Sequence, residues 1–265
     1  MKFFLLSFIL LLLVADFGGG AACSAGVDLS ESHALPPISL ESITASYRAG
    51  PVLEKQLQEI NCRIGSPIFI RVFKQEAELE LWVKKGLRYR LYKIYTICDY
   101  SGDIGPKLKE GDKQSPEGFY RVTAEMMNPW SNYHLAFNLG FPNEYDMANA
   151  RTGSNIMVHG RCSSVGCFAM TDFRMDEIYT LADAALRHGQ DAFEVHIFPF
   201  RLNKSNMQAH ATNNWYPFWL NLKEGYDLFE SEKIPPAVTV YENKYHFSEG
   251  SNQSAISYQV KSEIQ

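Results

Sequence analysis

Short apolar runs alternate with charged or turn-forming positions through the middle of the chain. Three of these runs, IFIRVF (68–73), ELELWV (78–83) and RLYKIYTI (90–97), are rich in β-branched and aromatic residues and are separated by charged turns. This pattern predicts antiparallel strands. It predicts further strands at residues 119–123, 133–138, 155–160 and 193–200. In the last of these, His196 is out of phase with its apolar neighbours, so we expect its side chain to be exposed.

Two segments have the period of a helix with one apolar face. In the first, over residues 49–65, Pro51 stands at the start and the apolar positions recur at Leu53, Leu57, Ile60 and Ile64. In the second, over residues 174–188, they recur at Ile178, Leu181, Ala185 and Leu186. Strands and helices together predict an α+β fold, a mostly antiparallel β domain with packed helices and a C-terminal extension.

The N-terminus has the pattern of an export signal. Lys2 is followed by an apolar run over residues 3–15 and then by small residues, which is typical of a secretory signal over residues 1–22. The run is too short to span a bilayer. Cys23 follows Gly-Ala-Ala and resembles a bacterial lipidation site, although ordinary cleavage near Ala22 remains an alternative. We predict an exported, periplasmic protein, soluble or held at the membrane only through a lipid on Cys23.

The remaining chain divides by composition. Residues 23–48 contain Ser and Pro without a clear period, so we expect a flexible lead-in before the helix at 49–65. The main domain is predicted over residues 66–222. A C-terminal extension with a polar tail follows over residues 223–265.

Composition and charge narrow the class of protein. Hydrophobic residues make up 46% of the 265 positions, as in an ordinary globular protein. The net charge of −5 and the lack of a dense Lys/Arg block exclude tracking of a nucleic-acid backbone. Five cysteines are too few for a disulfide scaffold, and their odd number leaves room for a reactive thiol. Cys62 could pair with Cys98, and Cys162 could be a redox partner of nearby Cys167; the sequence leaves this open.

The candidate chemistry lies in IMVHGRCSSVGCFAMTD (156–172). His159 stands at a predicted strand end, and Cys167 stands between Gly166 and a predicted helix start. A thiolate is a strong nucleophile, and a neighbouring imidazole can take the proton of the thiol. Backbone amides around Gly166 could stabilise an oxyanion. A buried structural cysteine beside an incidental histidine is the alternative.

This stretch resembles the catalytic domain of the L,D-transpeptidase (YkuD-like) family, and most closely its YafK-type branch. The resemblance extends over residues 50–230 and makes 66–222 the catalytic domain. It implies that Cys167 is the nucleophile and His159 its base. It also implies that the Gly160 carbonyl orients the imidazole, that Gly166 and Cys167 form the oxyanion hole, and that Ser164 is a turn residue or a substrate contact. Two positions depart from the larger family, which has His where Val165 stands and Arg where Ala169 stands.

The resemblance implies a peptidoglycan-remodelling enzyme of cell wall biogenesis that needs no cofactor or metal. The thiolate attacks the carbonyl at the L-centre of diaminopimelate in a stem peptide, expels the attached amine and leaves a thioester. The acceptor is left open among another diaminopimelate amine, a lipoprotein lysine and water. The alternatives are therefore a transferase and a hydrolase that trims stem peptides or releases a wall-attached lipoprotein.

Four further residues are candidates for substrate binding: Arg161, Tyr133, His134 and Asn143. Arg161 could pair with a carboxylate of the stem peptide, although a solvated arginine on a turn is the equal alternative. The other three could line a substrate cleft or simply lie on a strand surface.

Three rival functions remain. His159, Cys162 and Cys167 are of zinc-ligand type, but the spacing matches no common zinc motif. A papain-like peptidase would place its histidine after the cysteine, so His188 or His196 would serve as the base. A non-catalytic wall-binding module is the third rival.

Overall fold

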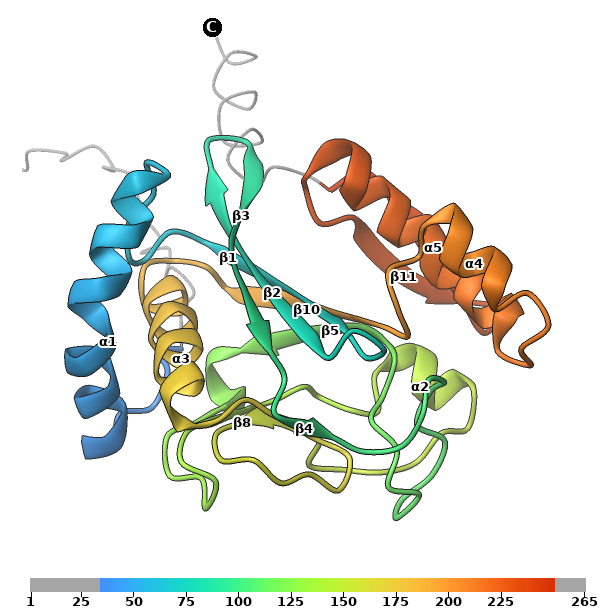
Figure 1. Ribbon diagram of the computed structural model, residues 1–265, viewed down its shortest axis with the longest axis horizontal. Coiled ribbons are helices and arrows are strands. Elements are labelled where there is room, and N and C mark those ends of the chain that lie inside the picture. Colours follow the sequence, from blue (N-terminus) through green and yellow to red (C-terminus); the bar gives the residue numbers. More distant parts are fainter. Residues whose placement is uncertain (1–33, 251–265) are drawn as a thin grey trace, which may run out of the picture. The chain divides into compact units, whose positions relative to one another are not determined.

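The computed structural model describes residues 34–250. The predicted signal at 1–22, Cys23 and the end of the polar tail lie outside the described residues. A five-stranded sheet forms the centre of the fold, in the order β3-β2-β1-β10-β5 (Figure 1). Its strands are β1 (Ile68–Phe73), β2 (Glu78–Lys85), β3 (Arg88–Thr96), β5 (Gly118–Thr123) and β10 (Ala192–Phe198). Neighbours pair antiparallel except β1 with β10, which confirms the predicted α+β class.

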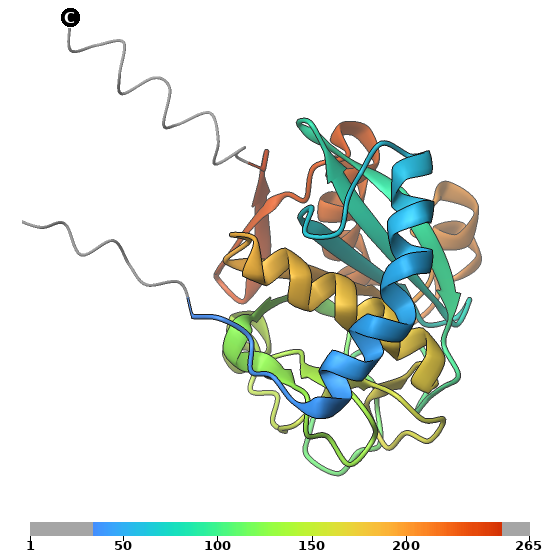
Figure 2. The ribbon, with the colours of Figure 1, turned by 90° about the vertical axis from the view of Figure 1, so that its left-hand side faces the viewer.

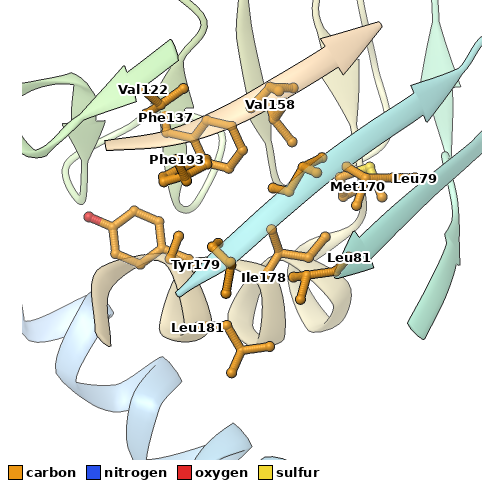
Figure 3. Packing of buried hydrophobic residues seen from close by; sticks show 14 of the residues in the cluster. Leu79, Leu81, Val122, Phe137, Val158, Met170, Ile178, Tyr179, Leu181 and Phe193 are labelled. Atoms are coloured by element: carbon orange, nitrogen blue, oxygen red, sulfur yellow. The ribbon is translucent and has the colours of Figure 1, made fainter. Parts of the chain in front are cut away.

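Two helices cover one face of this sheet. Helix α3 (Asp172–Arg187) packs its apolar side on the strands, and α1 (Leu40–Glu59) lies against α3 (Figure 2). Ile178 and Leu181 of α3 meet Leu79 and Leu81 of β2 in a single buried cluster (Figure 3). Removal of this apolar surface from water is the main stabilising contribution to the domain.

Both predicted bounds of the helix at 49–65 are wrong. The prediction of a flexible lead-in over 23–48 is also wrong for its last residues, which are helical. Helix α1 begins at Leu40, where Ser39 and Ser42 form a capping box, and it ends at Glu59. Buried Ala45 and Ala49 extend the face of Leu53 and Leu57 by two turns, but small residues give a weak hydrophobic signal.

The opposite face of the sheet carries the C-terminal part of the described chain. It includes α4 (Lys204–Ala209), α5 (Tyr216–Glu232) and the hairpin of β11 (Ala237–Tyr241) and β12 (Lys244–Ser248). Phe73, Phe198, Trp219 and Tyr245 pack together there. The predicted domain boundary at 222 falls inside α5, and the start of the C-terminal extension stays a prediction.

A second five-stranded sheet of short strands carries the candidate site, in the order β4-β9-β8-β7-β6. Its members are β4 (Asp99–Tyr100), β6 (Met127–Asn128), β7 (Ala136–Asn138), β8 (Met157–His159) and β9 (Phe168–Ala169). A 3-10 turn, η1 (Ala124–Met126), and α2 (Glu144–Ala148) lie in its connections. Within residues 34–250, no helix is both long and apolar enough to cross a membrane.

Candidate active site

His159 ends β8 with its imidazole buried and oriented. Its Nδ1 lies 2.6 Å from the carbonyl oxygen of Gly160. A carbonyl can only accept, so Nδ1 carries the proton and Nε2 of the neutral ring has a free lone pair. Burial lowers the pKa of His159 below its ordinary value, while the bond to Gly160 opposes the shift. The ring is therefore ready to act as a base near neutral pH.

Cys167 stands directly before β9, beside the strand that carries His159. Its Sγ accepts a hydrogen bond from the amide of Met157 at 3.3 Å, and Met157 lies on β8 with His159. Strands β8 and β9 are parallel, with His159 paired to Ala169. Burial raises the pKa of the Cys167 thiol, against the Met157 amide and the charge of Lys107. A raised pKa favours the neutral thiol, which is a weaker nucleophile than the thiolate.

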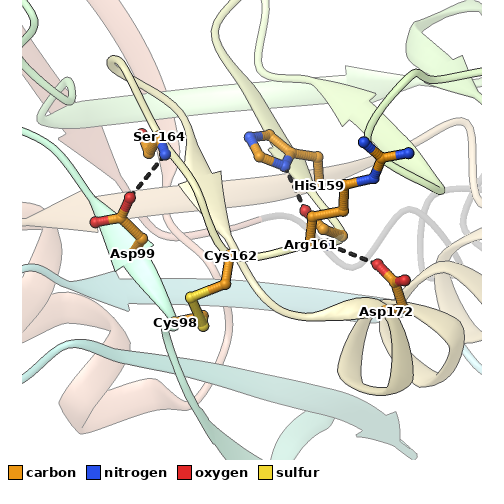
Figure 4. Close-up of a disulfide and its surroundings, with 8 residues drawn as sticks. Cys98, Asp99, His159, Arg161, Cys162, Ser164 and Asp172 are labelled. Carbon is orange, nitrogen blue, oxygen red and sulfur yellow. Dashed lines mark hydrogen bonds between the residues drawn. A yellow bond between two sulfur atoms is a disulfide. The ribbon is translucent and has the colours of Figure 1, made fainter.

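A disulfide holds the loop between His159 and Cys167. Cys98 and Cys162 are bonded, with their Cα atoms 5.3 Å apart (Figure 4). Next to it, the amide of Ser164 donates to Asp99 Oδ2 at 2.7 Å. Pairing of Cys62 with Cys98 is therefore wrong, and Cys162 is not a partner of Cys167; Cys62 and Cys167 are free. Cys162 has no thiolate for a metal, which removes one ligand of the rival zinc site.

Ser164 and Gly166 shape the turn before Cys167. The Ser164 hydroxyl donates to the Cys167 carbonyl oxygen at 2.7 Å and accepts from the Gly166 amide at 3.1 Å. Gly166 has φ +129°, and a Cβ there would crowd Ile156, so glycine is required. Because its amide is already bonded to Ser164, the oxyanion role of Gly166 stays a prediction.

Gly160, Arg161 and Tyr133 surround one side of the His159 imidazole. A Cβ on Gly160 would come within 2.9 Å of the Tyr133 carbonyl and nearer still to Asp172. The Arg161 amide donates to Asp172 Oδ1 at 2.6 Å (Figure 4). The Arg161 guanidinium lies 5.9 Å from the Tyr133 ring, which lies 4.7 Å from the His159 ring. An exposed cation and an aromatic ring thus flank the candidate base.

His134 and Asn143 are engaged in contacts within the protein. His134 lies 2.6 Å from Asp176 and 3.3 Å from Glu41, so its ring bridges α3 and α1. Asn143 caps α2 and donates to the Phe119 carbonyl. Their substrate contacts stay predictions, and the function proposed below does not use them.

The loop over residues 101–118 contains residues that the sequence pattern did not single out. Ser115 donates through its hydroxyl to the Cys167 carbonyl oxygen at 3.3 Å. Lys107 is buried and forms an ion pair with Asp112 at 2.6 Å. Its positive charge lowers the pKa of the Cys167 thiol, against the larger effect of burial. The Gly and Pro residues of this segment indicated a loop but did not indicate which residues the loop contacts.

Two positions depart from the larger family, which has His where Val165 stands and Arg where Ala169 stands. Val165 is exposed, and Ala169 is fully buried and leaves no room for a long cationic side chain.

The sequence of this chain is similar to those of known proteins over a range that includes His159 and Cys167. Residues 67–197 match the family model YkuD, L,D-transpeptidase catalytic domain. The chain is 41% identical over 229 residues to YafK of Escherichia coli (strain K12), described as a candidate L,D-transpeptidase; the match covers 86% of this chain and 92% of that protein.

Two solved structures are more distant. The helical cell shape determining protein Pgp2 from Campylobacter jejuni aligns at 20% identity and TM-score 0.40, covering 80% of this chain and 77% of its own. Bd1075 from Bdellovibrio bacteriovorus aligns at 17% identity and TM-score 0.37, covering 71% and 89%. The family-model match and the extensive identity to YafK together establish that this chain belongs to the YkuD family of L,D-transpeptidase catalytic domains.

Proposed function

We propose that this peptidoglycan enzyme of L,D-transpeptidase type uses Cys167 as nucleophile and His159 as general base. One observation carries the proposal. The hydrogen bond from His159 Nδ1 to the Gly160 carbonyl leaves the Nε2 lone pair free, and the amide of Met157 on the same strand donates a hydrogen bond to Cys167 Sγ. General-base activation is required because burial keeps the thiol protonated.

The chemistry follows from this protonation state. His159 Nε2 takes the thiol proton as Cys167 Sγ attacks the carbonyl at the L-centre of diaminopimelate. The tetrahedral intermediate collapses, the carbon–nitrogen bond breaks, and the departing amine takes the proton from the imidazolium. A thioester remains on Cys167, and an amine or water resolves it. The exposed guanidinium of Arg161, beside the Tyr133 ring, pairs with a carboxylate of the stem peptide.

The acceptor defines the reaction class. An amine from a second stem peptide gives a cross-link, a lipoprotein lysine gives attachment, and water gives hydrolysis. We propose an amine acceptor, in keeping with the L,D-transpeptidase family to which the chain belongs, and hydrolysis is the alternative that the products must exclude. The Cys98–Cys162 disulfide supports export, since such bonds persist in oxidising compartments.

Acylation by a carbapenem, followed by intact mass and peptide mapping, tests the nucleophile. We expect one adduct at Cys167 in the wild type and in Cys62→Ser, the matched change at the other free thiol of the described chain. Cys167→Ala should give no adduct and unfold at the same temperature as the wild type. A wild type that is never acylated would favour a non-catalytic wall-binding module.

Products from purified muropeptides identify the acceptor. New cross-linked species in the chromatogram mean transfer, as proposed. Trimmed stems or freed lipoprotein peptide without cross-links would instead assign the enzyme as a hydrolase, and both activities should disappear in Cys167→Ala.

A further inference from the structure

A buried ion pair lies beneath the loop that precedes β5. Lys74 and Glu117 are both fully buried, and Lys74 Nζ is 3.1 Å from Glu117 Oε1. Lys74 also donates to the carbonyl oxygens of Gly105 at 2.7 Å and of Ser115 at 3.0 Å. One ammonium group therefore joins the two ends of the segment 105–115.

Glu117 connects this pair to helix α5. Its Oε1 accepts from the Gly105 amide at 2.5 Å, and its Oε2 accepts from Trp219 Nε1 at 2.9 Å. Trp219 is fully buried in α5, beyond the residues 67–197 that match the family model. Trp215 packs on Gly105, where a Cβ would lie 2.7 Å from its indole nitrogen. The C-terminal helix thus touches the loop at two points.

The same loop reaches the nucleophile. Ser115, whose carbonyl is bonded to Lys74, donates through its hydroxyl to the Cys167 carbonyl oxygen at 3.3 Å. That oxygen also accepts from Ser164. The main chain of Cys167 is therefore held from two sides, by its own turn and by the loop that Lys74 closes.

We infer that Trp219, Glu117 and Lys74 are positioning residues for the Cys167 thiol, an inference that rests on the proposed function. Hydrogen bonds link Trp219 to Glu117, Glu117 to Lys74, Lys74 to Ser115 and Ser115 to Cys167. A buried ion pair is weak as a source of stability compared with a packed apolar pair. Its role here is geometric, because the two charges fix two backbone segments at defined places.

The segment after residue 197 is thereby part of the machinery that aligns the thiol. A displacement of about 1 Å at reacting atoms costs on the order of 100-fold in rate. Loss of one hydrogen bond at the far end of the network should therefore reduce acylation without removing the thiol.

Trp219→Phe tests the inference with a matched control. It removes the indole N–H from Glu117 and preserves most of the aromatic packing. Trp82→Phe makes the same change elsewhere, because Trp82 Nε1 donates to buried Glu80 at 2.9 Å. Glu80 also accepts from Arg71 and Arg201. We expect Trp219→Phe to lower the saturating carbapenem acylation rate about fivefold or more, and Trp82→Phe less than twofold.

Two further readouts separate positioning from folding. Alkylation of Cys167 by iodoacetamide needs no aligned substrate and should change less than twofold in both variants, with folding monitored by circular dichroism. Equal acylation in the two variants, or a loss in Trp219→Phe that matches its unfolded fraction, would overturn the inference. If the wild type were not acylated, the proposed function would fail first. The inference rests on the proposed function and would fall with it in that case.

Discussion

The surroundings of His159 and His196 differ although both histidines lie on strands and both are buried. Burial lowers the pKa of each imidazole, and that of His196 falls well below 6.5. His159 has Nδ1 bonded to Gly160. His196 lies between the rings of Phe69 and Phe119, each 4.6 Å away, and within residues 34–250 neither of its ring nitrogens has a hydrogen-bond partner.

The difference shows what marks a candidate base. Both rings have a lowered pKa, so the pKa alone does not distinguish a candidate base from a buried structural histidine. At His159 a backbone carbonyl selects the tautomer, and the same strand binds the thiol of Cys167 through the Met157 amide. Among the described residues, His196 has no such orienting bond. Function is therefore assigned from the oriented lone pair rather than from burial.

Replacement of His159 should have the largest effect. His159→Ala is expected to lower carbapenem acylation by roughly 10²–10⁴-fold, the contribution typical of a general base. Rapid-mixing mass spectrometry measures the rate, and His188→Ala is the control, because its ring binds the Ala184 carbonyl at the end of α3. Loss of acylation in His188→Ala or in a His196 variant, with His159→Ala active, would favour the papain-like order.

Removal of the disulfide tests how far the crosslink stabilises the region around His159. The Cys98–Cys162 bond closes a separation of 64 residues. Cys98→Ser/Cys162→Ser is expected to lose about 4 kcal/mol of unfolding free energy by loop entropy, measured by urea denaturation. The acylation rate should fall as well, because the loop before Cys167 loses its crosslink. An unchanged denaturation midpoint, with Cys62→Ser as reference, would contradict this.

The pH dependence should show a neutral thiol and imidazole rather than a preformed ion pair. The pKa of His159 is lowered, so the acid limb of the acylation rate should lie below pH 6.5, falling about tenfold per unit under its pKa. The Cys167 pKa is raised, so alkylation should climb steadily toward alkaline pH. Thiolate absorbance at 240 nm in the wild type at pH 7, absent from Cys167→Ala, would contradict the neutral pair.

Local patterns predicted much of the fold but less of the site. Alternating runs located the strands of the central sheet, and the segment from His159 to Cys167 was recognisable by residue type. The exposure expected for His196 is wrong, because β10 is central and buried on both faces, so alternation carries no information there. The Cys98–Cys162 bond and the contacts of Lys74 depend on residues distant in sequence. Periodicity within one element cannot report them.

Replacement of His196 should have the smallest effect and completes the comparison. His196→Leu removes two buried nitrogens that lack partners among the described residues, so stability at pH 7.5 should be equal or greater. In the wild type the folded state keeps His196 neutral while the unfolded state binds a proton below pH 6.5. The protein therefore loses stability as pH falls below that value, by up to about 1.4 kcal/mol per unit from this group. Urea denaturation at pH 7.5 and pH 5 should show a smaller acid loss in His196→Leu, with acylation within twofold of wild type; equal acid losses would show that His196 is already protonated in the fold.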